Sequence, residues 1–349
     1  MSRNDAFILT LAYPETVVAH PEEWYTMFLR FLGVGNKNYV RAGHAALVLI
    51  KKETGALEYY DFGRYITALS YGRVRSQKTD FELKVPLKAE IENDTILNLN
   101  TILEFFATQP KFTHGEGYLH ASVCKVISYN LARTFIDNIQ SKGFVRYAAF
   151  IKDASNCARF VTDVLIESTT NTKIKKQLIK SKWFTPSTIG NVVIADTENC
   201  VYKISELGEF HKFNSTIKKE NIRLFLDQLK AYNPSLVGSL QPKDNTIKSN
   251  DAQWLSGTGS GAWFEIYDLN SKIEYRFRRI SCYGTIDCDG IYRIDKEGFD
   301  INLDYQFQHH SNCLCFYIEQ DSIQYRFDFV KEFKKKGEFC HLDRVKNER

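Results

Sequence analysis

The feature that most constrains the fold of this chain is a change of sequence pattern near residue 240. Before it, apolar residues at helical spacing alternate with short apolar runs that are typical of strands. After it, the chain carries short runs of alternating character, at 262–267, 273–280, 290–294, 301–306, 314–318 and 323–329. A length of 349 residues is enough for two ordinary domains. We therefore expect an α+β domain followed by a small antiparallel all-β domain.

The boundary between the two domains is predicted from polar, turn-forming residues. Residues 237–252 are rich in glycine, serine, proline, asparagine and lysine, a composition typical of a linker. We expect an α+β domain over 1–236, this linker, a β domain over 253–333 and a charged tail over 334–349. The glycine-rich segment 257–261 lacks the Gly-Lys-Ser/Thr ending of a phosphate loop and leads into a strand, so we interpret it as a tight turn.

Charge and apolar content exclude several classes of partner. The net charge of +4 is small for this length, so we expect no nucleic-acid partner. No apolar run is long enough for a membrane span, and the N-terminus does not have the pattern of a signal peptide. The eight cysteines have no disulfide-framework spacing and favour reduced thiols. We expect a cytoplasmic protein without a cofactor, and the pattern indicates no oligomeric state.

Periodicity predicts the elements around the candidate site. We expect strands at 6–12, 43–50 and 57–66 and a helix from about Pro21 to Leu32. Asn93-Asp94 is expected to cap a helix that extends to about Phe106, and a second long helix is expected from about Tyr118 to Lys142. Further along, helices are predicted at 175–181 and 221–229, and strands at 191–195 and 200–204.

Cys157 is the candidate nucleophile. It follows Ser155-Asn156, either of which is suited to cap a helix, and it begins a helix whose apolar positions include Phe160 and Val161. Unpaired backbone N–H groups and the positive end of the helix dipole stabilise a thiolate at this position. The alternative is a small buried side chain, because free cysteine is among the most buried residue types.

His44 is the candidate base for this thiol. It begins an apolar strand about a hundred residues before Cys157, and strand ends are where a sheet presents polar groups to a cleft. The alternative is a structural histidine. A cysteine at a helix start together with a histidine at a strand start indicates thiol chemistry more specifically than either residue does.

The two motifs resemble those of a known superfamily. Gly43-His44-Ala45-Ala46 followed by Asn156-Cys157-Ala158-Arg159-Phe160-Val161 resembles the circularly permuted papain-like group, which is related to the NlpC/P60 hydrolases and includes the lecithin retinol acyltransferase-like proteins. The resemblance covers about residues 5–200. It implies a helix with the nucleophile packed on an antiparallel sheet with the base, and thioester chemistry on an amide or ester. The whole chain also resembles an uncharacterised bacterial two-domain family, which implies no activity.

The resemblance also implies a third polar residue on the next strand, for which Asp61 is the candidate. A tight turn near residue 54 sets residue 64 or 65 opposite His44, which leaves Asp61 on the same face but about two pleats away. Asp61 therefore needs a bulge or a shifted register to orient the imidazole. The alternative is a strand-end carboxylate paired with Arg64 or Arg73.

These residues predict a cysteine-dependent hydrolase or acyltransferase. His44 would deprotonate Cys157, and the thiolate would attack an amide or ester carbonyl, such as that of a peptide. The alternative is a catalytically inactive binding or interaction protein with the same fold. A third interpretation is a zinc-stabilised β module, but the spacing of its potential ligands is not typical of zinc sites and we expect no metal: Cys282, Cys288, His309, His310, Cys313 and Cys315.

Two further histidines flank the Gly115-Glu116-Gly117 loop. His114 precedes it and His120 follows it. Either they border the cleft, or they only mark the turn between two elements.

Overall fold

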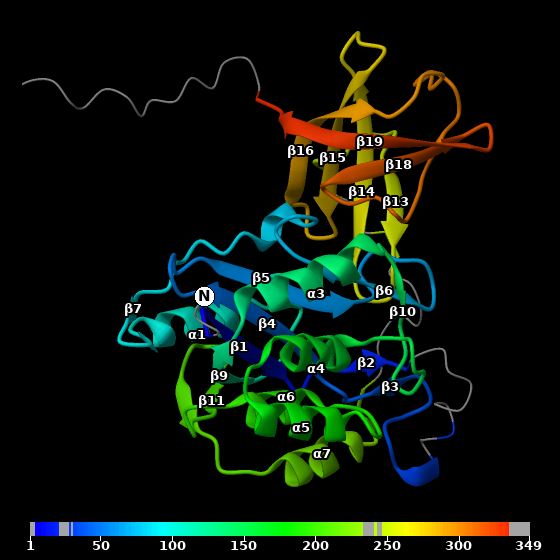
Figure 1. Ribbon diagram of the computed structural model, residues 1–349. Helices are drawn as coiled ribbons and strands as arrows, with labels where there is room; N and C mark the ends of the chain where they lie inside the picture. The colour runs from blue at the N-terminus through cyan, green and yellow to red at the C-terminus, as the bar shows by residue number, and fades with distance from the viewer. Residues whose placement is uncertain (1–3, 21–27, 29–30, 233–240, 243–245, 335–349) are drawn as a thin grey trace, which may run out of the picture. The chain divides into compact units, whose positions relative to one another are not determined.

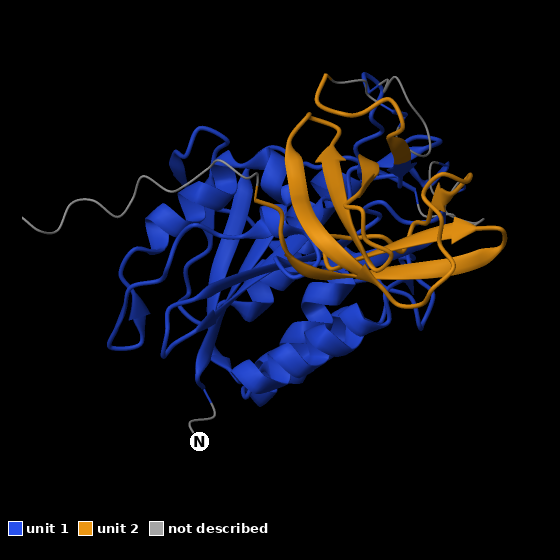
Figure 2. Ribbon diagram, turned by 90° about the horizontal axis from the view of Figure 1, so that it is seen from above, with its two compact units in different colours: residues 1–242, 255–261 blue, residues 243–254, 262–349 orange. Residues whose placement is uncertain are grey.

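The computed structural model of the chain describes residues 4–20, 28, 31–232, 241–242 and 246–334. The chain divides into two compact units, residues 1–242 with 255–261 and residues 243–254 with 262–349 (Figure 2). The first unit contains helices and strands and the second contains strands, which confirms the predicted fold class. Residues 237–240 and 243–245 of the predicted linker 237–252 lie outside the described residues, as does the predicted tail 334–349 apart from residue 334, so the predicted domain bounds stay a prediction.

The first unit is built on an eight-stranded sheet with the order β10-β6-β5-β4-β1-β9-β11-β12 (Figure 1). All its pairings are antiparallel. The strands are β1 (Ala6–Tyr13), β4 (His44–Lys51), β5 (Leu57–Gly63), β6 (Tyr71–Arg75), β9 (Leu119–Ile127), β10 (Val145–Arg146), β11 (Tyr202–Ile204) and β12 (Phe210–Lys212). Two small pairs accompany it, β2 (Val18–Ala19) with β3 (Tyr39–Val40) and β7 (Ile91–Glu92) with β8 (Thr95–Ile96).

Both faces of this sheet are covered by apolar cores. On one face Ile8 and Leu47 pack with α3 (Tyr129–Ser141), α4 (Cys157–Ser168), α5 (Thr172–Ser181) and α6 (Thr188–Ala195). On the other, Leu9 and Val48 pack with α1 (Leu99–Thr108). Side chains of a strand alternate between faces, so a strand buried on both reads as a continuous apolar run. This is why β1 is apolar apart from Thr10, and β4 is apolar between His44 and Lys51.

Helix α4 begins at Cys157, as predicted, because Asn156 caps it. The Asn156 side chain accepts a hydrogen bond from the backbone N–H of Arg159 at 2.9 Å. Phe160, Val161 and the later apolar residues of the helix pack on the sheet. The cap and the core contacts together fix the first turn of α4 against the strands.

Three predicted elements of the first unit were wrong. Asn93-Asp94 does not cap a helix but lies in the turn between β7 and β8, and α1 begins only at Leu99, after Asn98. The long helix from Tyr118 to Lys142 is β9 followed by α3, with Ser128 between them. The spacing of Val123, Val126 and Ile127 mimics a helix, but β9 is largely buried, so it shows no polar alternation. Residues 191–195, predicted as a strand, end α6, which the Ser187 side chain caps. The pattern of a short apolar run does not by itself distinguish a buried strand from a buried helix.

The remaining helices of the first unit are α2 (Pro110–Thr113) and α7 (Ile217–Phe225). The helix predicted from Pro21 to Leu32 falls mostly outside the described residues. Among the described residues, no helix has the length and apolar character needed to cross a bilayer.

The second unit contains a seven-stranded antiparallel sheet with the order β13-β14-β15-β16-β19-β18-β17. Its core is aromatic, with the rings of Phe277 and Phe316 stacked at 4.6 Å. Residues 301–306 were predicted as a strand, but only Gln306 belongs to one. The strands are β13 (Gln253–Ser256), β14 (Gly261–Asp268), β15 (Glu274–Ser281), β16 (Ile286–Ile294), β17 (Gln306–Phe307), β18 (Cys315–Gln320) and β19 (Ile323–Glu332).

Candidate active site

Cys157 lies at the first turn of α4, where its thiol faces the start of β4. Its side chain is almost buried, with 7% of the residue exposed. The sulfur lies 3.8 Å from the carbonyl oxygen of Gly43, the residue that precedes β4. Cys157 also lines a pocket of about 240 Å³ in the first unit. The thiol is therefore packed against the sheet but borders an internal space.

His44 begins β4 and is held between neighbouring groups. It lies opposite Tyr13 of β1, and the two rings stack at 6.4 Å. Its Nε2 lies 3.3 Å from Oδ2 of Asp61 and 3.4 Å from the hydroxyl of Tyr65. Burial by itself lowers the pKa of His44, but the interactions with Asp61 and Cys157 outweigh it and raise the pKa to about 9. The imidazole is thus protonated at neutral pH.

Asp61 reaches His44 because the register of β4 and β5 differs from the predicted one. The predicted turn sets residue 62 or 63 opposite Ala46, whereas in the structure Asp61 itself pairs with Ala46. Ala46 and His44 are two residues apart on β4, so they share one face of the strand. Asp61 is therefore displaced from His44 by two residues along the strands, and its carboxylate reaches the imidazole diagonally across the two strands. The pairing of β4 with β5 runs from Ala46 and Asp61 to Ile50 and Leu57 without a register shift.

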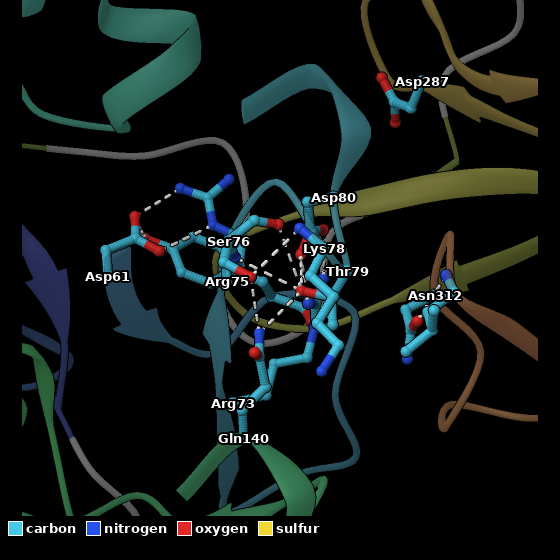
Figure 3. Close-up of polar contacts among 12 residues, drawn as sticks. Asp61, Arg73, Arg75, Ser76, Lys78, Thr79, Asp80, Gln140, Asp287 and Asn312 are labelled. Atoms are coloured by element: carbon cyan, nitrogen blue, oxygen red, sulfur yellow. Dashed lines mark hydrogen bonds and ion pairs between the residues drawn. The ribbon is translucent and has the colours of Figure 1, made fainter. Parts of the chain in front are cut away.

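Arg75 is the main cationic partner of Asp61. The two residues lie directly opposite one another on β5 and β6, and Arg75 donates from both Nε and Nη2 (Figure 3). The hydroxyls of Tyr59 and Tyr65 also donate to Oδ2, at 3.0 and 3.2 Å. Burial by itself raises the pKa of Asp61, but Arg75 and His44 hold it well below its usual range.

The alternative partners expected for Asp61 were wrong. Arg73 forms a bidentate pair with Asp80 instead (Figure 3). Arg64 donates to the backbone carbonyls of Ala19 and His20.

Sequence reasoning missed Arg75, Tyr59 and Tyr65. Tyr59 and Asp61 are two residues apart and share a face of β5, and this spacing alone identifies the tyrosine as a neighbour. Arg75 required the pairing of β5 with β6, which the turn-poor segment between these strands does not predict. Tyr65 lies beyond the end of β5; the predicted turn set residue 64 or 65 opposite His44, but the pattern assigned Tyr65 no role in the site.

The two other histidines have different surroundings. His114 ends α2 in the left-handed conformation, and its ring centroid lies 5.1 Å from that of Tyr65. It therefore marks the turn and also borders the network around Asp61. Burial, then the charge of Arg75, lowers the pKa of His114 to about 3. His120 lies within β9, where burial lowers its pKa to about 4, and its Nδ1 has no hydrogen-bond partner among the described residues.

The pocket beside Cys157 is mainly apolar. Its described lining contains no lysine, arginine, aspartate or glutamate. His20 is part of it, and burial lowers the pKa of this histidine, which keeps it neutral at pH 7. The larger apolar side chains that line it are Val34, Val40, Tyr147, Phe150, Phe184 and Phe225.

The zinc interpretation finds no support in the described part of the chain. Among these residues, no three histidine, cysteine, aspartate or glutamate side chains converge in a way that would hold a metal ion. None of the seven cysteines that the structure describes forms a disulfide bond with another of them.

Comparison with known proteins gives two family matches. Residues 8–174 match the model of type VI secretion system effector TseH-like proteins, and this range contains His44, Asp61 and Cys157. Residues 252–330 match the DUF6695 C-terminal domain. The crystal structure of the type VI secretion system effector TseH is similar at 18% identity and a TM-score of 0.38, covering 60% of this chain and 99% of that one. No curated protein matches the sequence.

Proposed function

We propose that this chain is a cysteine-dependent hydrolase or acyltransferase. Cys157 is the nucleophile, His44 is the acid and base, and Asp61 orients the imidazole. The observation that carries the proposal is the position of His44, whose Nε2 lies 3.3 Å from Asp61 and whose pKa the Cys157 side chain helps to raise. A nucleophile, a base and a group that orients the base are the parts that thioester catalysis requires.

The mechanism proceeds through a thioester. The proton of the thiol resides on His44, and the Cys157 thiolate attacks the carbonyl carbon of an amide or ester. Backbone N–H groups at the start of α4, including that of Cys157, stabilise the oxyanion. Protonated His44 then gives its proton to the leaving amine or alcohol. In hydrolysis, a water molecule loses a proton to His44 and attacks the thioester, which releases the acid and restores the thiol; in acyl transfer, an alcohol or amine takes the place of water.

The pocket suggests which part of the substrate lies beside the thiol. Because its described lining is apolar and uncharged, it favours a neutral apolar group next to the reacting carbonyl. An apolar cavity of about 150 Å³ binds benzene. The volume of about 240 Å³ therefore accommodates a group somewhat larger than one aromatic ring.

The match of residues 8–174 extends the proposal to a biological setting. The matching family is described as type VI secretion system effector TseH-like. We propose that this chain is likewise delivered by such a system and acts as a hydrolase after delivery, in place of the cytoplasmic location expected from composition. A tagged chain that reaches the medium only when the secretion apparatus is intact would support this role.

Site-resolved alkylation tests the catalytic proposal. Iodoacetamide is added at pH 7, and the labelling rate of each cysteine is followed by peptide mass spectrometry in the wild type and in His44→Ala. We expect Cys157 to react at least about tenfold faster than buried Cys124 and faster than exposed Cys200, because its thiolate is stabilised by His44. We expect this advantage to be lost in His44→Ala.

The matched control is Cys124, which is buried in the same core cluster and whose pKa burial raises to about 12. Equal rates at Cys157 and Cys124, unchanged by His44→Ala, contradict the proposal. That outcome supports the binding-protein alternative on the same fold.

A further inference from the structure

The segment 257–260 connects β13 to β14, yet it belongs to the first compact unit rather than the second. It lies on the backbone that follows β5. The N–H of Gly259 donates to the carbonyl oxygen of Arg64 at 2.9 Å, and Ser260 forms a parallel β-bridge with Tyr65. The N–H of Gly257 donates to the Ser260 carbonyl at 2.8 Å, which closes the turn. The glycine-rich turn predicted from sequence therefore has a specific partner, the backbone of residues 64–67.

Gly257 approaches that backbone so closely that no side chain fits. A Cβ atom at this position would lie 2.6 Å from the carbonyl oxygen of Arg64 and 2.9 Å from the backbone nitrogen of Thr67. Backbone atoms give way less easily than the end of a flexible side chain. At Gly259, by contrast, a Cβ would lie 3.4 Å from the Arg64 oxygen, an ordinary contact distance. An alanine at position 257 would therefore displace the backbone of residues 64–67, whereas an alanine at position 259 would not.

The backbone held by this turn is itself strained. Ile66 has a φ of 51°, in the left-handed region, where a β-branched residue is rarely found. Such a conformation persists only when the surrounding structure determines it. The contacts of segment 257–260 lie on both sides of Ile66, on Arg64 and on Thr67. They are positioned to maintain this conformation.

Tyr65, next to Ile66, connects this backbone to the catalytic groups. Its hydroxyl lies 3.2 Å from Oδ2 of Asp61 and 3.4 Å from Nε2 of His44. The guanidinium carbon of Arg75 lies 3.8 Å from the centre of its ring. Because the residue is 4% exposed, its hydroxyl has little freedom to seek other partners. A displacement of the Tyr65 backbone therefore changes the contacts of both Asp61 and His44.

We propose that segment 257–260 is a positioning element of the active site. It fixes residues 64–67, so that Tyr65 acts as a positioning residue: its hydroxyl donates to Asp61 and accepts from protonated Nε2 of His44. The stretch of chain that connects the first two strands of the β sheet thereby controls the state of the imidazole. This inference rests on the proposed function, since it assigns His44 the role of acid and base.

The test measures the titration of His44 directly. The imidazole carbon resonance of His44 is followed by NMR against pH in the wild type, Tyr65→Phe, Gly257→Ala and the matched control Gly259→Ala, with assignment by comparison to His44→Ala. In Tyr65→Phe we expect His44 to titrate about one pH unit lower, because an acceptor for the protonated ring is lost. Gly257→Ala should also lower the pH at which His44 titrates, whereas Gly259→Ala should leave that pH unchanged.

The double variant gives the sharpest result. If Gly257 acts through Tyr65, then Gly257→Ala combined with Tyr65→Phe shifts the titration no further than Tyr65→Phe alone. A folded Gly257→Ala that titrates like the wild type overturns the role of the segment, and an unshifted Tyr65→Phe overturns the role of the hydroxyl. Additive shifts in the double variant overturn the claim that Gly257 acts through Tyr65. None of these readings depends on Cys157 reactivity, so failure of the proposed function, seen in the alkylation of His44→Ala, is distinguished from failure of this inference.

Discussion

Strand β6 contributes the arginines of two buried arginine–aspartate pairs, and the two pairs have different surroundings. Arg73 and Arg75 are two residues apart on β6, so they share a face, and each forms a two-bond pair with an aspartate. All four side chains are at most 7% exposed. Asp80 also accepts a hydrogen bond from Thr79, in the segment that follows β6. Asp61 also accepts from His44, Tyr59 and Tyr65.

The difference shows how one type of interaction serves two purposes. The pair of Arg73 with Asp80 joins a strand to the segment after it, and Arg73 Nε additionally donates to the Tyr65 carbonyl. The pair of Arg75 with Asp61 keeps a carboxylate charged beside an imidazole. A buried pair contributes little net stability by itself, but removal of one partner leaves an uncompensated charge. We therefore expect similar losses of stability from the two pairs and very different losses of activity.

The largest expected effect is on catalysis. Asp61→Asn should lower thioester-dependent turnover per folded molecule by about 10²- to 10⁴-fold, since the group that orients and stabilises the imidazolium is lost. Asp80→Asn, the matched control, should lower it by less than about tenfold. Turnover of a neutral ester, normalised to the folded fraction by circular dichroism, measures both. Equal losses in the two variants would remove the distinction between the pairs.

Stability should change by similar amounts in the same two variants. We expect each to lose about 3–5 kcal/mol in the free energy of unfolding, because each leaves a buried guanidinium unpaired. Urea denaturation at pH 7 measures the difference. A much smaller loss for Asp61→Asn would indicate that Tyr59 and Tyr65 compensate for the missing charge.

The free energy of unfolding should depend on pH through His44 and Asp61, in opposite directions. The pKa of His44 is raised to about 9, so its contribution is complete below about pH 6.5 and is lost as the pH rises towards 9, at a cost of about 3 kcal/mol. The pKa of Asp61 is lowered, so its contribution is present above about pH 4 and is lost as the pH falls below that value. Denaturation at several pH values should show the alkaline loss in the wild type and not in His44→Ala.

The smallest expected effect concerns the pocket. Phe184 lines it, whereas the neighbouring Trp183 does not and is 82% exposed. Phe184→Ala should lower kcat/KM for an ester with an apolar acyl group by a few-fold to about tenfold, because apolar contact area is lost, and should change an acetyl ester little. Trp183→Ala should change neither. A uniform loss with both esters would place Phe184 outside the substrate site.

The sequence predicted the parts of the site that depend on local pattern. Cys157 begins its helix because Asn156 caps it, and His44 begins its strand after the turn at Gly43, whose φ is positive. The partners of Asp61 depend on how β4, β5 and β6 align, and a shift of one residue changes every neighbour. Strands buried on both faces were equally difficult, because β9 loses the alternation that distinguishes a strand from a helix.

The central claim is that Asp61 and Cys157 keep the His44 imidazole protonated well above its ordinary pKa. The most direct measurement is the NMR titration of the His44 imidazole in the wild type and in Cys157→Ala. The account predicts that His44 remains protonated to about pH 9 in the wild type and titrates at a lower pH once the thiol is removed. A wild-type His44 that titrates near pH 6.5, or a titration that Cys157→Ala leaves unchanged, would contradict it.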